Sequence, residues 1–199
     1  RTNANLLARS IPFNAEADSL NAAILGPDVG PDDEEFDLFA KEVAREMTVK
    51  AGQKCTAIRR AIVPSRHLDA MAVRLRDRLA KVSVGDPAVE GVKMGALASK
   101  AQQADVASRL ALLAKGNEIV FGAADGFAPK GEGVAGGSFF APTLVLCRDA
   151  TRNDAVHDVE AFGPVSTLMP YEDFDQAMTL AARGRGSLVA TLVTHDPKV

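Results

Sequence analysis

The chain has 199 residues, with 23 Lys and Arg against 26 Asp and Glu, which gives a formal net charge of −3. This charge balance excludes the basic surface of a nucleic-acid-binding protein and a general attraction to anionic lipids. No run of about 18 consecutive apolar residues occurs, so no membrane-spanning helix is predicted. Hydrophobic residues make up 47% and charged residues 25%, and this composition is typical of a globular domain with a buried core.

The ends of the sequence and its cysteines predict where the protein is found. The chain begins Arg1-Thr2-Asn3, with neither an initiator methionine nor a signal-peptide pattern, so we expect it to start inside a longer protein. Cys55 and Cys147 are the two cysteines, too few for a disulfide framework. We therefore expect a cytoplasmic protein.

Apolar runs and helical periodicity predict alternating strands and helices. In chain order the pattern predicts a strand at 20–25, a helix from 32 to 51, a strand at 60–63, helices at 68–79 and 99–115, a strand at 118–121, a loop at 122–138, strands at 143–146 and 166–169, a helix at 174–182 and a strand at 188–193. Continuously apolar strands alternating with helices predict an α/β fold with a mostly parallel sheet.

One nucleotide-binding pattern is rejected on its context. Gly131-Glu132-Gly133-Val134-Ala135-Gly136 matches G-x-G-x-x-G. The mechanism of that motif requires a strand directly before it and a helix after it. Here a loop rich in glycine and proline precedes it and Phe139-Phe140-Ala141-Pro142 follows, so we predict no dinucleotide site at this position.

Cys55 is the candidate nucleophile of the sequence. The cations Lys50, Lys54, Arg59 and Arg60 are its neighbours in sequence, and nearby positive charge favours the thiolate. The alternative is a small buried hydrophobic residue, the commonest role of a single cysteine. The three histidines, His67, His157 and His195, are predicted to be solvated surface groups, although a Cys–His pair stays open.

Three motifs in one order resemble the aldehyde dehydrogenase superfamily. Gly52-Gln53-Lys54-Cys55 resembles its nucleophile motif, Glu16 stands upstream where the family has its base, and Glu160-Ala161-Phe162-Gly163-Pro164-Val165 resembles its E-x-F-G-P-V signature. The resemblance covers the whole chain. It implies that Cys55 attacks the aldehyde and that Glu16 activates the water that hydrolyses the resulting thioester. It also implies that Glu160 holds the nicotinamide ribose and that Phe162 contacts the nicotinamide.

The same resemblance implies the fold, the domains and the cofactor. The expected fold is the three-layer α-β-α catalytic domain of an aldehyde dehydrogenase with a mostly parallel sheet. Residues 1–19 would end the nucleotide-binding domain, with its last strand and the base loop, and 20–199 would form a catalytic domain truncated at its C-terminus. NADP or NAD would be bound only in the full-length protein, and we therefore expect the fragment alone to be inactive.

Within the superfamily the sequence looks most like the ring-opening branch that oxidises CoA-linked semialdehydes in bacterial phenylacetate breakdown. That branch implies a CoA-linked aldehyde substrate, a fused hydratase-like domain in the full-length protein and a homo-oligomer. A semialdehyde dehydrogenase of benzoyl-CoA breakdown is the nearest alternative.

Two further readings come from other classes of protein. One is a Cys-dependent hydrolase or acyltransferase that pairs Cys55 with His67 or His157. The other is a non-catalytic α/β binding module in which Cys55 is buried.

Overall fold

A computed structural model of the chain describes residues 4, 8–10, 12, 19–122 and 127–198. The strands are β1 (Ala22–Leu25), β2 (Arg60–Pro64), β3 (Glu118–Phe121), β4 (Thr143–Leu146), β5 (Val165–Tyr171) and β6 (Ala190–Val193). The helices are α2 (Glu34–Thr48), α3 (Leu68–Leu79), α4 (Lys100–Leu113), α5 (Ala155–Asp158) and α6 (Phe174–Ala182). Short 3₁₀ turns lie at Val49–Gly52, Ser65–His67 and Val134–Gly136.

The described strands form a single sheet in the order β3-β4-β5-β2-β1-β6. All neighbouring strands pair in parallel except β3, which pairs antiparallel with β4. The predicted mostly parallel sheet is confirmed. Parallel strands need crossover connections, and the helices between them supply these.

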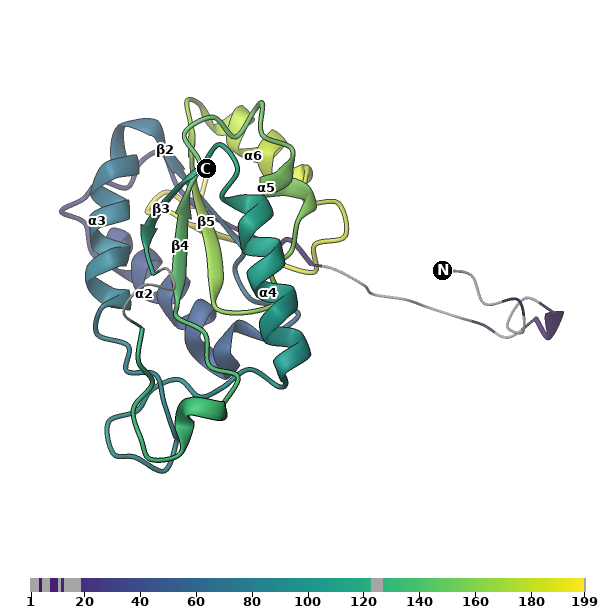
Figure 1. The fold of residues 1–199 in the computed structure, drawn as a ribbon. Helices are drawn as coiled ribbons and strands as arrows, with labels where there is room; N and C mark the ends of the chain where they lie inside the picture. Colours follow the sequence, from purple (N-terminus) through teal and green to yellow (C-terminus); the bar gives the residue numbers. More distant parts are fainter. Residues whose placement is uncertain (1–3, 5–7, 11, 13–18, 123–126, 199) are drawn as a thin grey trace.

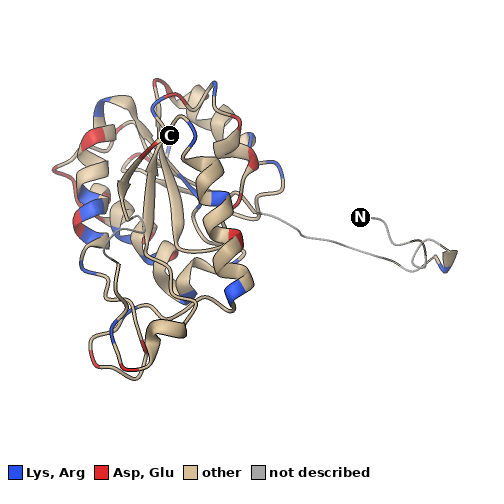
Figure 2. Cartoon of the chain, viewed as in Figure 1, with Lys and Arg blue, Asp and Glu red and all other residues tan. Residues whose placement is uncertain are grey.

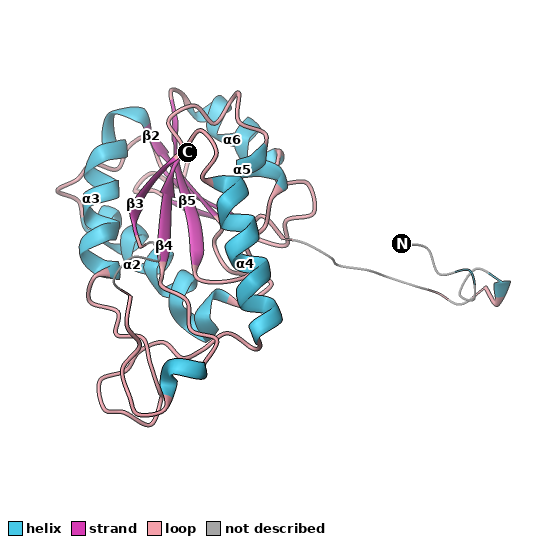
Figure 3. Ribbon diagram, viewed as in Figure 1, coloured by secondary structure: helices cyan, strands magenta, loops and turns pink. Residues whose placement is uncertain are grey.

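Helices cover both faces of the sheet, which gives the predicted three layers (Figures 1 and 3). Alternate residues of each strand point to opposite faces: Ile24 and Ile62 pack with α4, α5 and α6, whereas Leu25 and Val63 pack with α2 and α3. Strands β4 and β5 carry no charged residue, and most charged residues lie on helices and loops (Figure 2). Strands β1, β2, β4 and β5 are largely buried, whereas β3 and β6 at the two ends of the sheet are partly exposed.

The predicted elements are confirmed with small shifts of their ends, with two exceptions. The segment around His157, predicted as a loop, forms the short helix α5. The helix expected to continue to residue 51 ends at Thr48, and the next residues, Val49–Gly52, form a separate 3₁₀ turn. Lys50 and Ala51 have φ of 53° and 52°, in the left-handed region that non-glycine residues rarely adopt. This irregular turn leads directly into the segment that carries Cys55.

Candidate active site

The candidate site residues gather at the amino ends of three adjacent strands. Asn21 precedes β1, Cys55 to Arg59 precede β2, and Glu160 to Pro164 precede β5. Arg60 is aligned with Ala22 on one side and Thr167 on the other. Because these strands are parallel, the segments before them meet at one edge of the sheet. The two segments that the sequence analysis singled out are thus brought to the same edge.

The turn before Cys55 has an unusual backbone. Gly52 has a φ of 70°, so Lys50, Ala51 and Gly52 are three successive left-handed residues. For a residue with a side chain this conformation costs about 1–2 kcal/mol, and such strain persists where surrounding contacts hold it, often at functional sites. Cys55 itself is exposed, which contradicts the alternative in which it is a buried structural residue.

Asn21 holds the backbone around Cys55. Its Nδ2 donates hydrogen bonds to the carbonyl oxygens of Cys55 at 2.8 Å and Ala57 at 3.0 Å. Its Oδ1 accepts from the backbone N–H groups of Leu188 and Val189, each at 3.0 Å. Asn21 is fully buried, its bond to Ala57 is buried and the other three of these bonds are partly buried. One amide side chain therefore connects the start of β1, the cysteine segment and the segment before β6.

The two residues before Cys55 are anchored to other elements. Gln53 Oε1 accepts from Ala98 N at 2.8 Å. Lys54 Nζ contacts both carboxylate oxygens of Glu46, at 2.8 and 2.7 Å. Lys54 is therefore already paired with a carboxylate, which weakens its expected role as a cation for the thiolate.

Arg59 is also committed, and its partner is Glu160. Arg59 Nε lies 3.1 Å from Glu160 Oε1, with 3% and 9% of the two side chains exposed. Glu160 Oε2 accepts from the backbone N–H of Ser19 at 2.9 Å. The guanidinium also lies over the ring of Phe162, 5.3 Å from its centroid. Burial lowers the pKa of Arg59, and the Glu160 carboxylate offsets part of that effect.

Arg60 serves the fold. Its side chain is fully buried and donates to the carbonyl oxygens of Leu20, Leu180 and Ala181. The last two belong to the end of α6, where unpaired carbonyls favour a cation. Burial lowers the pKa of Arg60 to about 10. Arg60, like Arg59 and Lys54, is held by partners other than Cys55.

The prediction that the three histidines are solvated is wrong for His157. Its side chain is buried, with 3% of the residue exposed, because Nδ1 lies 3.0 Å from Arg60 Nη1 and Nε2 lies 2.8 Å from the Ala150 carbonyl. Arg60 can only donate, so Nδ1 accepts and the proton sits on Nε2. Burial lowers the pKa of His157 to about 4. With both ring nitrogens occupied, His157 is poorly suited to act as a base for Cys55.

His67 lies at the wrong end of β2 for a Cys–His pair. Cys55 precedes the strand and His67 follows it, and five strand residues span about 16 Å at roughly 3.3 Å each. The hydrolase alternative therefore has no suitably placed histidine among residues 19–122 and 127–198. Glu16, the predicted base, lies outside the described residues.

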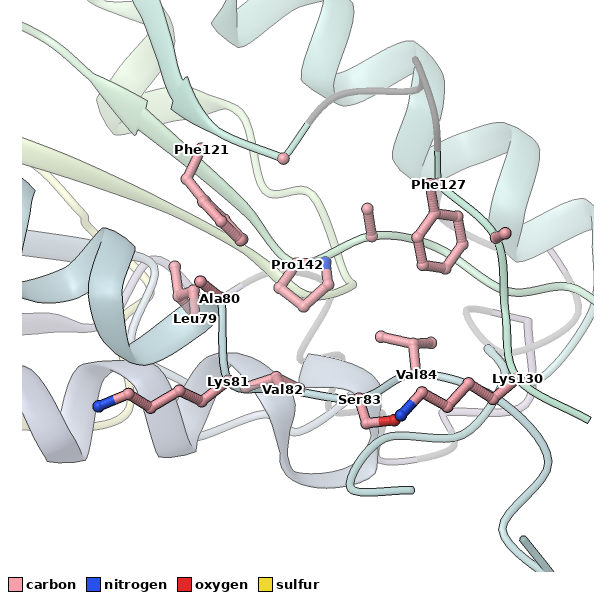
Figure 4. Close-up of a pocket in the computed structure, with 13 residues that line it drawn as sticks. Leu79, Ala80, Lys81, Val82, Ser83, Val84, Phe121, Phe127, Lys130 and Pro142 are labelled. Atoms are coloured by element: carbon pink, nitrogen blue, oxygen red, sulfur yellow. The ribbon is translucent and has the colours of Figure 1, made fainter. Parts of the chain in front are cut away.

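A cavity of about 530 Å³ opens elsewhere, between the end of α3, β3 and the loop after residue 127. Figure 4 shows Leu79, Phe121, Phe127 and Pro142 around it. Its lining includes neither Cys55 nor Glu160. The G-x-G-x-x-G segment forms a loop and a three-residue 3₁₀ turn, as its context predicts.

The part of the chain that the structure describes contains neither a candidate membrane-spanning helix nor a candidate metal site. Its helices are all too short or too polar to cross a bilayer. Its His, Cys, Asp and Glu side chains form no group of three suited to a metal ion.

Several residues of the site carry no signal in the sequence that identifies their role. Asn21, Gln53 and Ser19 are ordinary polar residues whose partners in other segments lie 34 to 168 positions away. The sequence around Arg59 indicates only a cation near Cys55. The one available signal was its place at the start of an apolar strand, where a charged residue needs a buried partner.

An α/β sheet that brings an exposed cysteine to the same edge as a buried carboxylate and an aromatic ring defines a candidate catalytic domain of a cysteine-using enzyme. The sequence model described as the aldehyde dehydrogenase family matches residues 7–199. The chain belongs to the aldehyde dehydrogenase family.

Individual relatives agree with this membership. The chain is 50% identical over 196 residues to 3,4-dehydroadipyl-CoA semialdehyde dehydrogenase of Aromatoleum evansii, which covers 98% of the chain and 38% of that protein. It is 46% identical over 102 residues to Protein MaoC of Klebsiella aerogenes, covering 51% of the chain and 29% of that protein. The chain thus spans well under half the length of these relatives.

Solved structures agree with the fold. Betaine aldehyde dehydrogenase of Staphylococcus aureus, in complex with NAD⁺ and with a BME-modified cysteine, superposes with a TM-score of 0.75 at 27% identity, over 91% of the chain and 35% of that protein. A 1-pyrroline-5-carboxylate dehydrogenase from Thermus with bound NAD gives a TM-score of 0.74 at 26% identity, over 92% and 33%. The expected catalytic-domain fold is confirmed.

Proposed function

We propose that this chain is the catalytic-domain part of an NAD(P)-dependent dehydrogenase that oxidises a CoA-linked semialdehyde to its acid in bacterial breakdown of aromatic compounds. The observation that carries the proposal is the convergence of Cys55 and the Glu160–Phe162 segment on one sheet edge. The similarity to 3,4-dehydroadipyl-CoA semialdehyde dehydrogenase supports the substrate class.

The Cys55 thiolate adds to the aldehyde carbon and forms a hemithioacetal. Bound nicotinamide would accept the hydride that leaves this carbon, and a thioester then remains on Cys55. The bond from Asn21 to the Cys55 carbonyl fixes the cysteine backbone during this step. Within residues 19–122 and 127–198 the Cys55 N–H has no acceptor, so it is free to donate to the developing oxyanion.

Hydrolysis of the thioester needs an activated water, and we assign this step to Glu16. Its carboxylate takes a proton from water, the resulting hydroxide attacks the thioester carbonyl, and the acid leaves as the Cys55 thiolate is restored. The position of Glu16 three residues before Ser19 supports the assignment, because Ser19 N–H bonds Glu160 at the edge where Cys55 lies.

Glu160 and Phe162 suit a nicotinamide riboside. A carboxylate offers about four acceptor positions, and in Glu160 one oxygen receives Arg59 Nε and the other Ser19 N–H. Each oxygen therefore keeps an acceptor position for a ribose hydroxyl. The half-buried Phe162 ring beside it offers an apolar contact for the nicotinamide. We propose NADP as the preferred cofactor, with NAD as the alternative.

The finer substrate follows from the sequence motifs, which resemble the phenylacetate branch. A semialdehyde dehydrogenase of benzoyl-CoA breakdown is the second candidate. The 50% identity to an enzyme named for 3,4-dehydroadipyl-CoA semialdehyde makes that aldehyde the first comparison substrate. The values of kcat/KM for the CoA-linked semialdehyde of the phenylacetate branch and for 3,4-dehydroadipyl-CoA semialdehyde are compared, and their ratio decides between the candidates.

The organisation of the whole protein is also part of the proposal. Residues 1–19 would end a nucleotide-binding domain, 20–199 would belong to the catalytic domain, and a hydratase-like domain would be fused in the full-length homo-oligomer. The free cysteines Cys55 and Cys147 support a cytoplasmic location, since a reducing compartment keeps thiols unpaired.

The decisive experiment uses the complete gene product and follows NAD(P)H formation by absorbance with each CoA-linked semialdehyde. We expect Cys55→Ala to abolish turnover and Cys147→Ser, the matched control, to retain it. Glu16→Gln should accumulate a thioester on the peptide that carries Cys55, detected by mass spectrometry. Turnover that persists in Cys55→Ala would refute the proposal.

A further inference from the structure

Arg59 contacts both segments of the candidate site at once. Besides Glu160 Oε1, its guanidinium donates from Nη1 to the Gly163 carbonyl and from Nη2 to the Gly52 carbonyl, each at 2.8 Å. Gly52 stands three residues before Cys55, and Gly163 follows Phe162 directly. All three guanidinium nitrogens, Nε, Nη1 and Nη2, thus have an acceptor. The acceptors belong to two segments more than 100 positions apart in sequence.

The backbone of Arg59 is itself fixed between two strands. Its N–H donates to the Asn21 carbonyl at 3.1 Å, and its carbonyl accepts from Thr167 N at 2.8 Å. Since Asn21 precedes β1 and Thr167 belongs to β5, the guanidinium extends from a point held on both sides. Only 3% of the side chain is exposed, so water does not compete for its bonds.

The geometry requires an arginine. A planar guanidinium can donate in three directions and stack on an aromatic ring at the same time. An ammonium is a single charged point at the end of a flexible chain and cannot reach three separated oxygens and a ring face together. Lysine at this position would keep the charge opposite Glu160 but lose the connection between the two carbonyls.

We propose that Arg59 is a positioning residue that fixes the cysteine segment, residues 50–56, against the cofactor segment, residues 160–164, and orients the Glu160 carboxylate. The inference deepens the proposed function, because it rests on the roles given above to Cys55, Glu160 and Phe162. Without Arg59 the buried Glu160 carboxylate has no cation beside it, and the two segments lose the bonds that hold them in register.

The first test measures hydrogen exchange on the 199-residue chain and needs neither aldehyde nor cofactor. In Arg59→Met we expect exchange in both segments to accelerate together by about tenfold or more, equivalent to about 1.4 kcal/mol of local stability. Exchange within α4 should change much less. The exchange rates of Arg59→Lys should lie between those of Arg59→Met and those of the unaltered chain. Arg59→Lys serves as the test variant if Arg59→Met does not fold.

Arg74→Met is the matched control. Arg74 also pairs with a carboxylate, that of Asp37 at 2.8 Å, and lies over a phenyl ring, 5.6 Å from the centroid of Phe36, but it belongs to α3. We expect it to leave both site segments unchanged. The proposal is overturned if Arg74→Met accelerates them as much as Arg59→Met, or if Arg59→Met and Arg59→Lys accelerate only one segment or neither.

The second test uses the complete gene product and separates orientation of Glu160 from general stability. We expect the KM for NAD(P) to rise by about tenfold in Arg59→Met, corresponding to about 1.4 kcal/mol, and less in Arg59→Lys, with the KM for the aldehyde changed little. Normal KM values in both variants would overturn the role of Arg59. If exchange responds as expected but the unaltered protein oxidises no aldehyde, the proposed function fails while the link between the segments stands.

Discussion

The backbones of Gly52 and Gly163 lie so close together that Gly52 could not carry a side chain in the observed arrangement. A Cβ placed on Gly52 would lie 2.1 Å from the carbonyl oxygen of Gly163 and 2.5 Å from its carbonyl carbon. A Cβ on Gly163 would in turn lie 2.8 Å from Val106 Cγ2 on α4. The cysteine segment and the cofactor segment therefore meet backbone to backbone, with α4 behind them.

Gly52→Ala tests this close approach. Alanine at a φ of 70° costs about 1 kcal/mol of strain, and overlap with the Gly163 backbone adds about 1–3 kcal/mol. We expect urea unfolding to show a loss of about 2–4 kcal/mol for this variant. In the complete protein the displaced cysteine segment should also lower aldehyde oxidation.

Gly116→Ala is the matched control for Gly52→Ala. Gly116 has a φ of 75° but no atom within 4 Å of its Cβ position, so it should lose only the strain contribution. Equal losses of unfolding free energy in the two variants would show that contact with Gly163 does not restrict Gly52.

The elements of the fold were predictable because their signals are local. Largely apolar runs such as 143–146 favour a strand buried on both faces, and α3 was predicted with its observed ends, Leu68–Leu79. The motif order also brought Cys55 and Glu160 into one hypothesis. The assigned roles of Cys55, Glu16, Glu160 and Phe162 stay predictions.

What the sequence missed depends on partners far away along the chain. The apolar and charged pattern around Arg59 does not reveal that its guanidinium pairs with Glu160, 101 positions later. His157 was expected in water because its segment was predicted to be a loop, whereas it is buried with its ring nitrogens against Arg60 and the Ala150 carbonyl. Left-handed backbone at Lys50 and Ala51 has no residue signature, since glycine is the usual occupant of such positions.

Asn21→Ala should destabilise the chain and disturb the Cys55 segment. The substitution removes bonds to the carbonyls of Cys55 and Ala57 and to two backbone N–H groups. Buried groups left without a partner cost about 1–3 kcal/mol each, so we expect a loss of at least about 3 kcal/mol in urea unfolding. The rate at which Cys55 is alkylated should also differ from that of the unaltered chain.

Asn153→Ala provides the comparison for Asn21→Ala. The Asn153 side-chain amide donates one hydrogen bond, to Asn117 Oδ1 at 3.0 Å, and the residue is only half-buried. We expect it to lose about 1 kcal/mol or less and to leave Cys55 alkylation unaltered. Similar effects of both variants would contradict the anchoring role of Asn21.

The two cysteines should differ sharply in reactivity. Cys55 is exposed, whereas Cys147 is 1% exposed, and burial raises the pKa of the Cys147 thiol. With iodoacetamide we expect Cys55 to be alkylated in the native chain and Cys147 only after unfolding in urea. Peptide mass spectrometry distinguishes the two sites. Rapid native alkylation of Cys147 would contradict its burial.

The contributions of His157 and His195 to the free energy of unfolding should depend on pH in opposite directions. The folded-state pKa of His157, about 4, lies below its ordinary value near 6.5, because burial disfavours the imidazolium. The unfolded chain therefore binds more protons between these values, and the His157 contribution to stability is complete above pH 6.5 and falls as pH drops toward 4. His157→Asn should flatten this part of the urea-unfolding profile.

For His195 the sign is reversed. Its hydrogen bond to Asp33 and the nearby charge of Glu35 raise its pKa. Its contribution is present below the ordinary value near pH 6.5 and is lost as pH rises through the folded-state pKa. Because His195 is exposed, we expect a small effect that salt screens. Identical pH profiles for His157→Asn and His195→Asn would contradict both assignments.

The 199-residue chain by itself should self-associate through β6. This strand ends the order of described strands, and Leu192 on it is 39% exposed, beside the exposed Leu188 and Val189. A strand edge with free backbone groups and apolar side chains favours pairing with a second copy. We expect sedimentation velocity to show dimers or larger species that increase with concentration, and Leu192→Lys to reduce them. Leu112→Lys alters an equally exposed leucine on α4 and should leave the association unchanged. An unaltered chain that stays monomeric at high concentration would show that this edge does not associate.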